Sequence, residues 1–419
     1  MEKIFVGIDW ATKEHQVCAI DNTGQILGER AFAHSGAGID ALYAWLLELA
    51  GGHRERLQVA IETPHGAVVE TFLERGVAIH AINPKQLDRF RDRFTMAGAK
   101  DDRRDAHVLG DSLRTDGHCF RRLVVDEPAV IELREWSRMV EDLQQERVRL
   151  GNRVREQLRR YYPQFLELGD DVAGDWFLSL WELLPTPSAA SRVAESEVAP
   201  ILKKHRLRRL DAEKVLAITR QQPVTVAPGT TEAATAHIRV VAAQLRLINE
   251  QIKQAHHRLD ELCAALSAPS QDDEQGQRCE QRDVEILDSL PGIGRIVLAT
   301  LLAEASQPLK ARDYHALRAL SGAAPVTRRS GKRCVVVMRY ACHGRLRNAL
   351  YHWSRVAVQK DPTSNARYAA LRKRGKSHGR ALRTVGDRLL SVACAMLRNQ
   401  TRYDPLHRVT AIERSFDAD

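Results

Sequence analysis

The chain has 419 residues, of which 44% are hydrophobic, and a formal net charge of +9. This length and apolar content indicate a globular protein of two or three domains. No apolar run approaches the roughly 18 residues of a membrane span and no signal peptide begins the chain, so we expect a cytoplasmic protein. Its seven cysteines form no CxxC pair, which favours reduced thiols and argues against a zinc site.

The charge is distributed unevenly along the chain. Residues 306–419 contain 24 Lys and Arg against 7 Asp and Glu, whereas the preceding 305 residues contain 39 against 47. A basic last third beside an acidic remainder suggests a module that binds a polyanion, attached to a carboxylate-rich one. A solvated basic surface is the alternative, but it explains an excess of 17 positive charges poorly.

The first 115 residues alternate between strand and helix patterns. Three strands in a meander precede β-α-β units, which is the ribonuclease H-like α/β arrangement. The predicted strands are residues 4–10, 15–20, 25–32, 57–61 and 77–82, and the predicted helices are 39–49 and 66–75.

Four acids occupy notable places in this arrangement. Asp9 and Glu62 each end a buried apolar strand, and Asp102 and Asp105 lie three residues apart on a predicted helix face. An acid at the end of a buried strand needs compensation, and four converging carboxylates would bind hard divalent cations. Two such ions about 3.5–4 Å apart stabilise both the attacking and the leaving oxygen of a phosphodiester displacement. Asp101 would point about 100° away from Asp102 on the helix.

Two long heptad patterns follow, at residues 133–161 and 238–266. Such coiled-coil helices could pair within one chain or between chains. We favour a contribution to self-association, with an intramolecular helical hairpin as the alternative. Residues 203–209 between them form a basic patch, and residues 267–282 have the composition of a linker.

Past the linker, Leu290-Pro291-Gly292-Ile293-Gly294 leads into an apolar helix. This is the helix-hairpin-helix signature, in which the backbone at Gly292 and Gly294 approaches a phosphate. A tight glycine turn between two helices is the alternative interpretation. The basic charge of the following residues favours contact with nucleic acid.

A serine lies among cations in Arg328-Arg329-Ser330-Gly331-Lys332-Arg333. A serine hydroxyl is a weak nucleophile unless charge stabilises the transition state. Here Arg328, Arg329, Lys332 and Arg333 could clamp a phosphate. The local chemistry by itself favours an ordinary loop serine.

The motifs taken together resemble a known family. The acids Asp9, Glu62, Asp102 and Asp105, with Lys100 before and Ala106 after the last pair, resemble the DEDD-type, RuvC-like domain of a group of bacterial insertion-sequence transposases. The C-terminal part resembles the partner domain of that group, and the resemblance covers essentially the whole chain in order. The motifs that carry it are residues 290–294, 322–325, 329–332 and His352-Trp353. The group includes Piv-like DNA invertases and recombinases guided by a bridge RNA.

The resemblance implies roles for particular residues. The four acids would bind Mg²⁺, two ions being expected, and Ser330 would attack DNA to form a covalent phosphoserine link. A structured noncoding RNA would specify donor and target. One departure is that many relatives have two adjacent serines before the glycine, whereas Arg329 occupies the first place here. Ser321 lies nearby in the sequence.

We therefore expect a bacterial, nucleoid-associated transposase or recombinase that acts as a homo-oligomer, a dimer or tetramer, on element ends and target DNA. The expected domains are a RuvC-like domain (1–125), a helical coiled-coil region (126–282) and a mainly α, basic, serine-bearing domain (283–419). Two alternatives remain: a water-using RuvC-like nuclease or junction resolvase, and a non-catalytic DNA-binding protein. A covalent protein–DNA adduct would distinguish the first alternative, because hydrolysis forms none.

Overall fold

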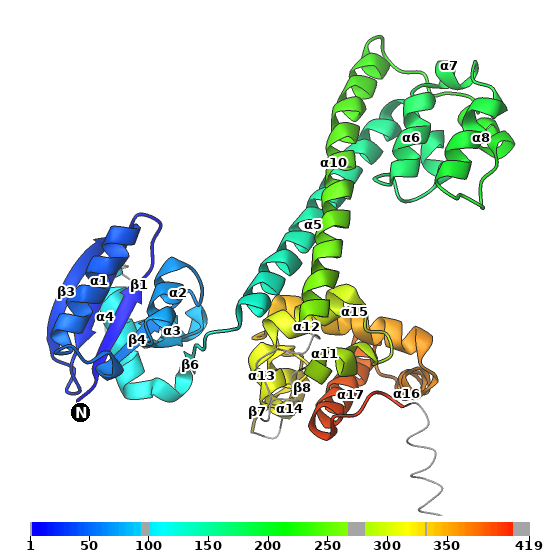
Figure 1. Ribbon diagram of the computed structural model, residues 1–419. Helices are drawn as coiled ribbons and strands as arrows, with labels where there is room; N and C mark the ends of the chain where they lie inside the picture. Colours follow the sequence, from blue (N-terminus) through cyan, green and yellow to red (C-terminus); the bar gives the residue numbers. More distant parts are fainter. Residues whose placement is uncertain (1, 94–100, 267–280, 332, 405–419) are drawn as a thin grey trace, which may run out of the picture. The chain divides into compact units, whose positions relative to one another are not determined.

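The computed structural model describes residues 2–93, 101–266, 281–331 and 333–404. Packing divides the chain into two compact units, Met1–Asp126 and Glu127–Asp419, which we call the N-terminal and C-terminal units (Figure 1). Most of the expected linker, residues 267–280, lies outside the described residues. No helix in the described ranges is both long enough and apolar enough to cross a membrane.

The N-terminal unit is built on a mixed six-stranded sheet with the order β3-β2-β1-β4-β5-β6. Its strands are β1 (Ile4–Asp9), β2 (Glu14–Ile20), β3 (Ile26–Ala33), β4 (Leu57–Ile61), β5 (Ala78–Ala81) and β6 (Arg121–Arg122). The first three form the expected antiparallel meander, and β4 and β5 continue parallel to β1. This α/β arrangement agrees with the ribonuclease H-like fold expected from the sequence.

Both faces of this sheet are covered by helices. These are α1 (Gly36–Leu49), α2 (Ala67–Glu74), α3 (Pro84–Arg91) and α4 (Asp102–Asp116). In β1 the side chains of Ile4, Val6 and Ile8 share a core with α1 and α2. Phe5 points the other way and packs with residues of α3 and α4. The two-residue alternation of a strand therefore assigns odd-numbered β1 residues to the α4 face.

A glycine allows α4 to lie directly on β1. A Cβ added at Gly7 would lie 1.8 Å from the carbonyl oxygen of Ala106 and 2.6 Å from the backbone nitrogen of Gly110. Real Cβ atoms never approach backbone so closely, so any larger residue at position 7 would push the helix away. The close contact brings the first turn of α4 beside the carboxyl end of β1.

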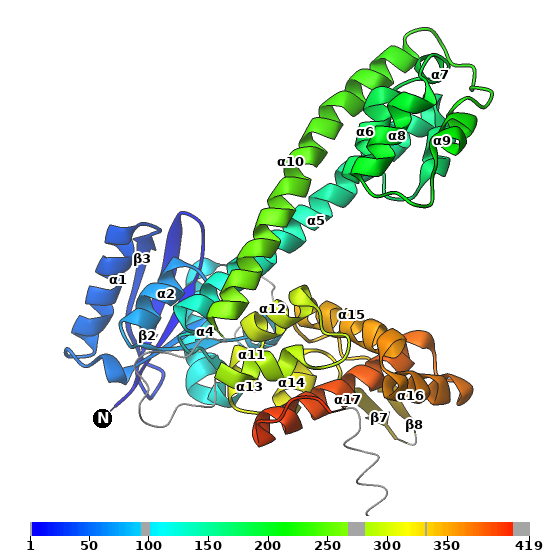
Figure 2. The same cartoon turned by 45° about the vertical axis from the view of Figure 1, so that its right-hand side comes forward.

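The C-terminal unit contains two long helices, α5 (Pro128–Tyr161) and α10 (Thr230–Ala265), which run along each other (Figures 1 and 2). Near one end of the pair, Leu133 and Val140 pack with Ala255, Leu259 and Leu262. Towards the other end, Leu150 and Val154 share a core with Ile238, Val241 and Leu245. The two heptad stripes thus pair within the chain, which is the second of the two possibilities left open by the sequence.

A small helical subdomain, residues 162–229, is inserted between α5 and α10. Its helices are α6 (Asp175–Leu183), α7 (Pro187–Ala190), α8 (Glu195–Lys204) and α9 (Ala212–Thr219). Aromatic side chains fill its core: Tyr162, Phe165, Phe177 and Trp181 are at most 1% exposed and share one cluster with Tyr161 of α5.

The remaining helices pack together around a separate core of the C-terminal unit, and we call this group the second body. They are α11 (Gln281–Asp288), α12 (Arg295–Glu304), α13 (Ser306–Lys310), α14 (Tyr314–Leu320), α15 (Gly344–Lys360), α16 (Pro362–Lys373) and α17 (His378–Asn399). Trp353 of α15 is fully buried at its centre, and its indole N–H donates to the carbonyl oxygen of Pro291 at 3.0 Å. A two-stranded hairpin, β7 (Val326–Ser330) and β8 (Arg333–Val337), completes this body.

A buried carboxylate joins α5 to this second body. The Glu304 side chain, 5% exposed, lies 3.1 Å from Arg138 of α5 and 3.2 Å from Arg345 of α15. Arg134 of α5 donates to the carbonyl oxygen of Ala303 beside it at 2.8 Å. Because burying a charge is costly unless it is paired, these contacts fix the base of α5 against α12 and α15.

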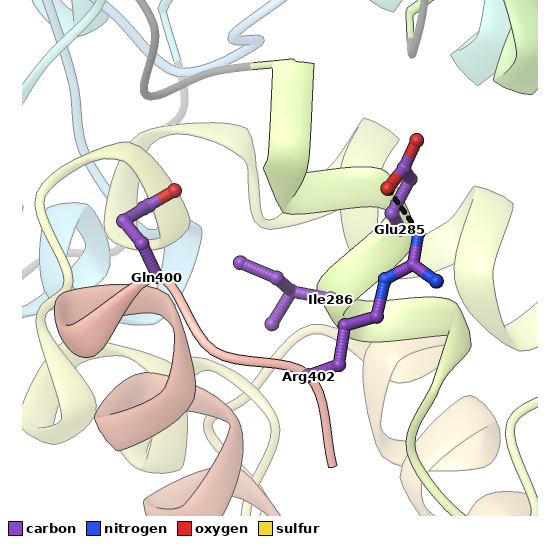
Figure 3. Close-up of a pocket in the computed structure, with 4 residues that line it drawn as sticks. All are labelled: Glu285, Ile286, Gln400 and Arg402. Atoms are coloured by element: carbon purple, nitrogen blue, oxygen red, sulfur yellow. Dashed lines mark hydrogen bonds and ion pairs between the residues drawn. The ribbon is translucent and has the colours of Figure 1, made fainter.

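A hollow of about 340 Å³ lies where the chain after α17 returns to α11. Figure 3 shows its lining: Glu285 and Ile286 come from α11, Gln400 and Arg402 come from the returning chain, and Arg402 forms an ion pair with Glu285. One ion pair and one apolar side chain provide no catalytic constellation. The hollow therefore lies where the segment that follows α17 packs against α11.

Candidate active site

Asp9 and Glu62 occupy equivalent places at the ends of neighbouring parallel strands. In the pairing of β1 with β4, Ile8 lies opposite Ile61, and the two acids directly follow these residues. Ile8 and Ile61 both point towards α1 and α2, so alternation turns Asp9 and Glu62 towards the face covered by α4. The sheet therefore presents two carboxylates side by side to the start of α4.

Asp102 and Asp105 lie in the first turn of α4, on one face of the helix. Asp102 is exposed, whereas Asp105 is only 3% exposed and directly precedes the part of the helix that lies on Gly7. Carboxylates are stabilised at a helix N-terminus by the helix dipole. Asp101 instead caps the helix, because its side chain accepts a hydrogen bond from the Arg103 backbone at 3.2 Å.

An arginine that sequence patterns did not single out links these acids. Arg91, the last residue of α3, donates from Nε to Asp105 Oδ1 at 2.7 Å and from Nη2 to Asp105 Oδ2 at 3.0 Å. The same Nη2 lies 4.0 Å from Glu62 Oε2, and Nη1 pairs with Asp88. Acids from β4 and α4 therefore converge on one guanidinium group.

Burial opposes the positive charge of Arg91. The hydrogen bonds to Asp105 and the charges of Asp105, Asp88 and Glu62 outweigh this effect, so the pKa of Arg91 is raised above its ordinary value. The guanidinium therefore stays charged at all relevant pH values. The buried Asp105 carboxylate is thus paired with a partly buried cation in place of water.

The donor set suits a hard divalent cation. The four side chains offer only carboxylate oxygens, which Mg²⁺ prefers over the nitrogen and sulfur ligands of zinc. In the described ranges, no three acidic, His or Cys side chains lie close enough to hold an ion as they stand. Two of the acids are directed at Arg91, a cation that meets the same charge requirement.

Ser330 lies at the tip of the β7–β8 hairpin, where it is exposed. Gly331 follows with φ of +54°, a left-handed conformation that glycine adopts readily, and the chain turns there. Lys332 lies outside the described residues. The hairpin thus presents the serine hydroxyl to solvent on a short and defined element.

The pairing within the hairpin separates the arginines into two groups. Ser330 lies opposite Arg333, and Arg328 lies opposite Val335, so these side chains share one face of the ribbon. Arg329 lies opposite Cys334 on the other face. Directly opposite residues have Cβ atoms about 4.5–5.5 Å apart, which allows Arg333 and Ser330 to contact one phosphate.

Ser321, the other serine near this motif, has different surroundings. It is 3% exposed at the end of α14, and its hydroxyl has no hydrogen-bond partner in the described part of the chain. A buried hydroxyl cannot reach a DNA backbone without local unfolding. Of the two serines, only Ser330 is therefore accessible to another molecule.

The two glycines of the predicted helix-hairpin-helix turn differ in their contacts. Gly292 has φ of +80°, and a Cβ there would lie 2.5 Å from the backbone nitrogen of Ala357 in α15. Gly294 precedes α12 and has open space around it. Packing on α15 accounts for Gly292, whereas Gly294 is exposed and makes no such contact.

The α16–α17 turn and the helix segments on either side of it form a strongly basic region. Residues 362–386 contain seven Lys and Arg and no Asp or Glu. None of the seven forms an ion pair within the described residues, and five are exposed: Arg367, Arg372, Lys373, Arg374 and Arg380. Unpaired cations at this density suit the phosphates of a nucleic acid.

Together, a carboxylate-rich ribonuclease H-like domain and a basic, serine-bearing helical region define a DNA transposase of the DEDD type. Comparisons with known proteins agree. A family model described as Transposase, for the DEDD transposases of IS110, matches residues 6–163, and one described as Transposase IS116/IS110/IS902 family matches residues 284–369. The chain belongs to the IS110/IS116 family of insertion-sequence transposases.

Individual relatives support this assignment. The putative transposase y4uE of Sinorhizobium fredii is 56% identical over 50% of this chain and 58% of its own length. The mini-circle putative transposase for IS117 of Streptomyces coelicolor is 30% identical over 96% of this chain and 95% of its own. An uncharacterised 44.8 kDa protein of insertion element IS116 from Streptomyces clavuligerus is 27% identical over 98% of both.

Proposed function

We propose that this transposase excises and inserts its element by Mg²⁺-dependent strand exchange through a covalent phosphoserine intermediate. The observation that carries the proposal is the exposure of Ser330 beside Arg333 on a hairpin tip. Two arginines on the face of the serine supply the positive charge that a phosphate under attack requires. The buried alternative, Ser321, lacks both features.

The reaction conserves the number of phosphodiester bonds. The Ser330 oxygen forms a bond to phosphorus while the bond to one DNA oxygen breaks, and the serine proton leaves with that strand end or with water. A hydroxyl of another strand then attacks the phosphoserine, and Ser330 is released. Arg328 and Arg333 hold the phosphate oxygens throughout. Mg²⁺ held by Asp9, Glu62, Asp102 and Asp105 would supply Lewis-acid stabilisation of the developing charge.

Nucleic acid is the proposed partner of the basic surfaces. We assign DNA of the element ends and target to the α16–α17 turn, the exposed hairpin arginines and the turn at Gly292 and Gly294, which we interpret as helix-hairpin-helix-like. A structured noncoding RNA that specifies donor and target is proposed from the family resemblance, together with association with the nucleoid. Lys332 belongs to the same proposed set.

Self-association is also proposed, because strand exchange needs more than one active site. The heptad helices α5 and α10 are proposed to behave as an intramolecular coiled coil, which leaves their outward sides to contact a second copy. On α10, Val240 and Leu247 are 62% and 61% exposed and lie seven residues apart.

The test uses the full chain with element-end DNA, RNA that co-purifies with the protein, and Mg²⁺. The expected product is a protein–DNA adduct that peptide mass spectrometry maps to Ser330. Ser330→Ala should remove the adduct and strand exchange but retain nucleic-acid binding. Asp105→Asn should abolish cleavage with nearly normal binding. Cleavage by Ser330→Ala without any adduct would support the water-using nuclease instead.

A further inference from the structure

Arg91 is bound to two of the carboxylates that the proposed function assigns to Mg²⁺, those of Asp105 and Glu62. Its fork binds both oxygens of Asp105, and the same guanidinium reaches Glu62. An arginine that engages both oxygens of a carboxylate occupies the lone pair of each oxygen that faces it, and its positive charge opposes the approach of a cation. Arg91 and a metal ion therefore compete for Asp105.

The metal-free state needs such a cation. Asp105 is 3% exposed, and a buried carboxylate without a partner is strongly unfavourable. Repulsion between neighbouring acids would add to this cost. The positive charge of Arg91 lies beside both Glu62 and Asp105. It therefore compensates the buried charge of Asp105 and reduces the repulsion between the two acids.

A second carboxylate, that of Asp88, can remain the partner of Arg91 after Arg91 leaves Asp105. Asp88 lies one turn earlier on α3, pairs with Nη1 of Arg91, and has a side chain that is 65% exposed. A guanidinium that releases Asp105 can therefore keep one ion pair and become solvated at the same time. The exchange leaves no charge of this group buried and unpaired.

We propose that Arg91 occupies the position of the divalent cation in the metal-free protein. When the metal binds, Arg91 leaves Asp105 and keeps only its ion pair with Asp88. The inference rests on the proposed metal site of Asp9, Glu62, Asp102 and Asp105. Arg91 is thus a positioning residue: it holds Asp105 and Glu62 near each other before the ion arrives, and it competes with the ion for Asp105.

The test measures metal binding directly, by titrating the full chain without nucleic acid with Mn²⁺ and recording free Mn²⁺ by electron paramagnetic resonance. An adjacent arginine changes the proton affinity of a carboxylate by about one to three powers of ten. On that scale Arg91→Gln should tighten Mn²⁺ binding by about tenfold. Asp88→Asn should weaken it by a factor of about two to five, the size of an exposed ion pair.

Thermal melting supplies a second readout. Arg91→Gln should melt at lower temperature than the wild type in a chelator, because Asp105 loses its partner, and saturating Mn²⁺ should close this deficit. Arg93→Gln is the matched control: Arg93 follows on the same segment but pairs with Asp116, away from the four acids. It should leave Mn²⁺ affinity unchanged.

The outcomes separate the two proposals. If the wild type and Asp105→Asn bind Mn²⁺ equally well, the metal site of the proposed function is wrong. If binding depends on Asp105 but Arg91→Gln binds Mn²⁺ no more tightly than the wild type, only the place-holding role is overturned. Tighter binding by Arg91→Gln and weaker binding by Asp88→Asn would establish the exchange.

Discussion

Ser330 and Arg333 lie directly opposite each other in the β7–β8 hairpin, whereas Arg329, the sequence neighbour of the serine, lies on the other face. Adjacency in the chain therefore does not identify which arginine lies beside Ser330. In a strand, the residue across the ladder is closer to a given side chain than the residue next to it.

This relationship predicts different effects for two neighbouring arginines. Arg333→Ala should lower the rate of adduct formation by about 10²–10³-fold, the usual cost of removing one group that stabilises transition-state charge. Arg329→Ala, which removes the same charge from the other face, should cost far less. Single-turnover adduct formation measures both. Equal losses would show that only total charge matters at the hairpin.

A second prediction concerns the α16–α17 turn. Arg374 and Arg380 are exposed and unpaired within the described residues, so they are free to neutralise phosphates. Each lost phosphate contact should reduce the slope of log affinity against log salt by about 0.9. Arg374→Ala with Arg380→Ala should lower the slope accordingly, as measured by fluorescence anisotropy with element-end DNA.

The control for that experiment is Arg149→Ala, which removes an exposed arginine already paired with Glu146. Its salt slope should match that of the wild type. A double variant with an unchanged slope would show that the turn does not contact the phosphates.

The contact of α4 with β1 predicts a large effect of one methyl group. Gly7→Ala should destabilise the N-terminal unit by about 1–3 kcal/mol or more, because the added Cβ overlaps backbone atoms of Ala106 and Gly110. Gly36→Ala, where a Cβ meets nothing within 4 Å, is the control. Urea unfolding measures both free energies, and equal stability of the two variants would contradict the close packing.

A pair of histidines predicts a dependence on pH. His15 is fully buried, its Nδ1 accepts from the Ala11 backbone N–H at 3.4 Å, and its Nε2 lies 2.9 Å from Nδ1 of His34. Burial, and then the charge of His34, lower the pKa of His15 below its ordinary 6.5. The unfolded chain thus takes up a proton more readily than the folded one.

Because the folded pKa is the lower one, the loss of stability begins as pH falls below about 6.5 and continues towards the folded value. Stability above that range should not change through this group. Melting temperatures at pH 7.5 and 5.5 test this, and His15→Gln should reduce the difference. Burial also lowers the pKa of His80 in the same unit, so part of the dependence should remain.

The long helices predict opposite results for two leucines close together on α10. Leu245 is fully buried against α5, and Leu247 is 61% exposed. Leu245→Glu should therefore lower the melting temperature strongly, whereas Leu247→Glu should leave it nearly unchanged. If α10 takes part in self-association, Leu247→Glu should reduce the mass measured by light scattering. An unchanged mass would confine α10 to packing within its own chain.

Strand positions in the N-terminal unit were predictable because a buried strand requires a continuous run of apolar residues in the sequence. Apolar runs such as Ile4–Ile8 and Leu57–Ile61 are what a strand covered on both faces requires. The acids at their ends were conspicuous for the same reason. The role of Arg91 was not predictable, because an arginine on a charged helix gives no local sign that it will meet Asp105.

The heptads show another limit of sequence patterns. The spacing of Leu245 and its neighbours specifies a buried seam, but it does not say whether the partner helix belongs to the same chain. Glu304 is a further case: it ends an apolar helix, and the three arginines around it come from α5 and α15. The sequence around Glu304 does not indicate these contacts, because the arginines lie far from it in the chain.

The insertion of residues 162–229 separates α5 from α10 in the sequence, although both helices pack on α12. Side chains from the start of α5 and the end of α10, such as Leu133 and Leu259, pack with Ala299 and Ala303 of α12. A truncated protein that begins at residue 283 would lose this cover. A better shortened protein would keep the start of α5 and the end of α10 and join them by a short turn near Leu143 and Ile252. The helical subdomain of residues 162–229 would then be removed together with the helix segments that carry it.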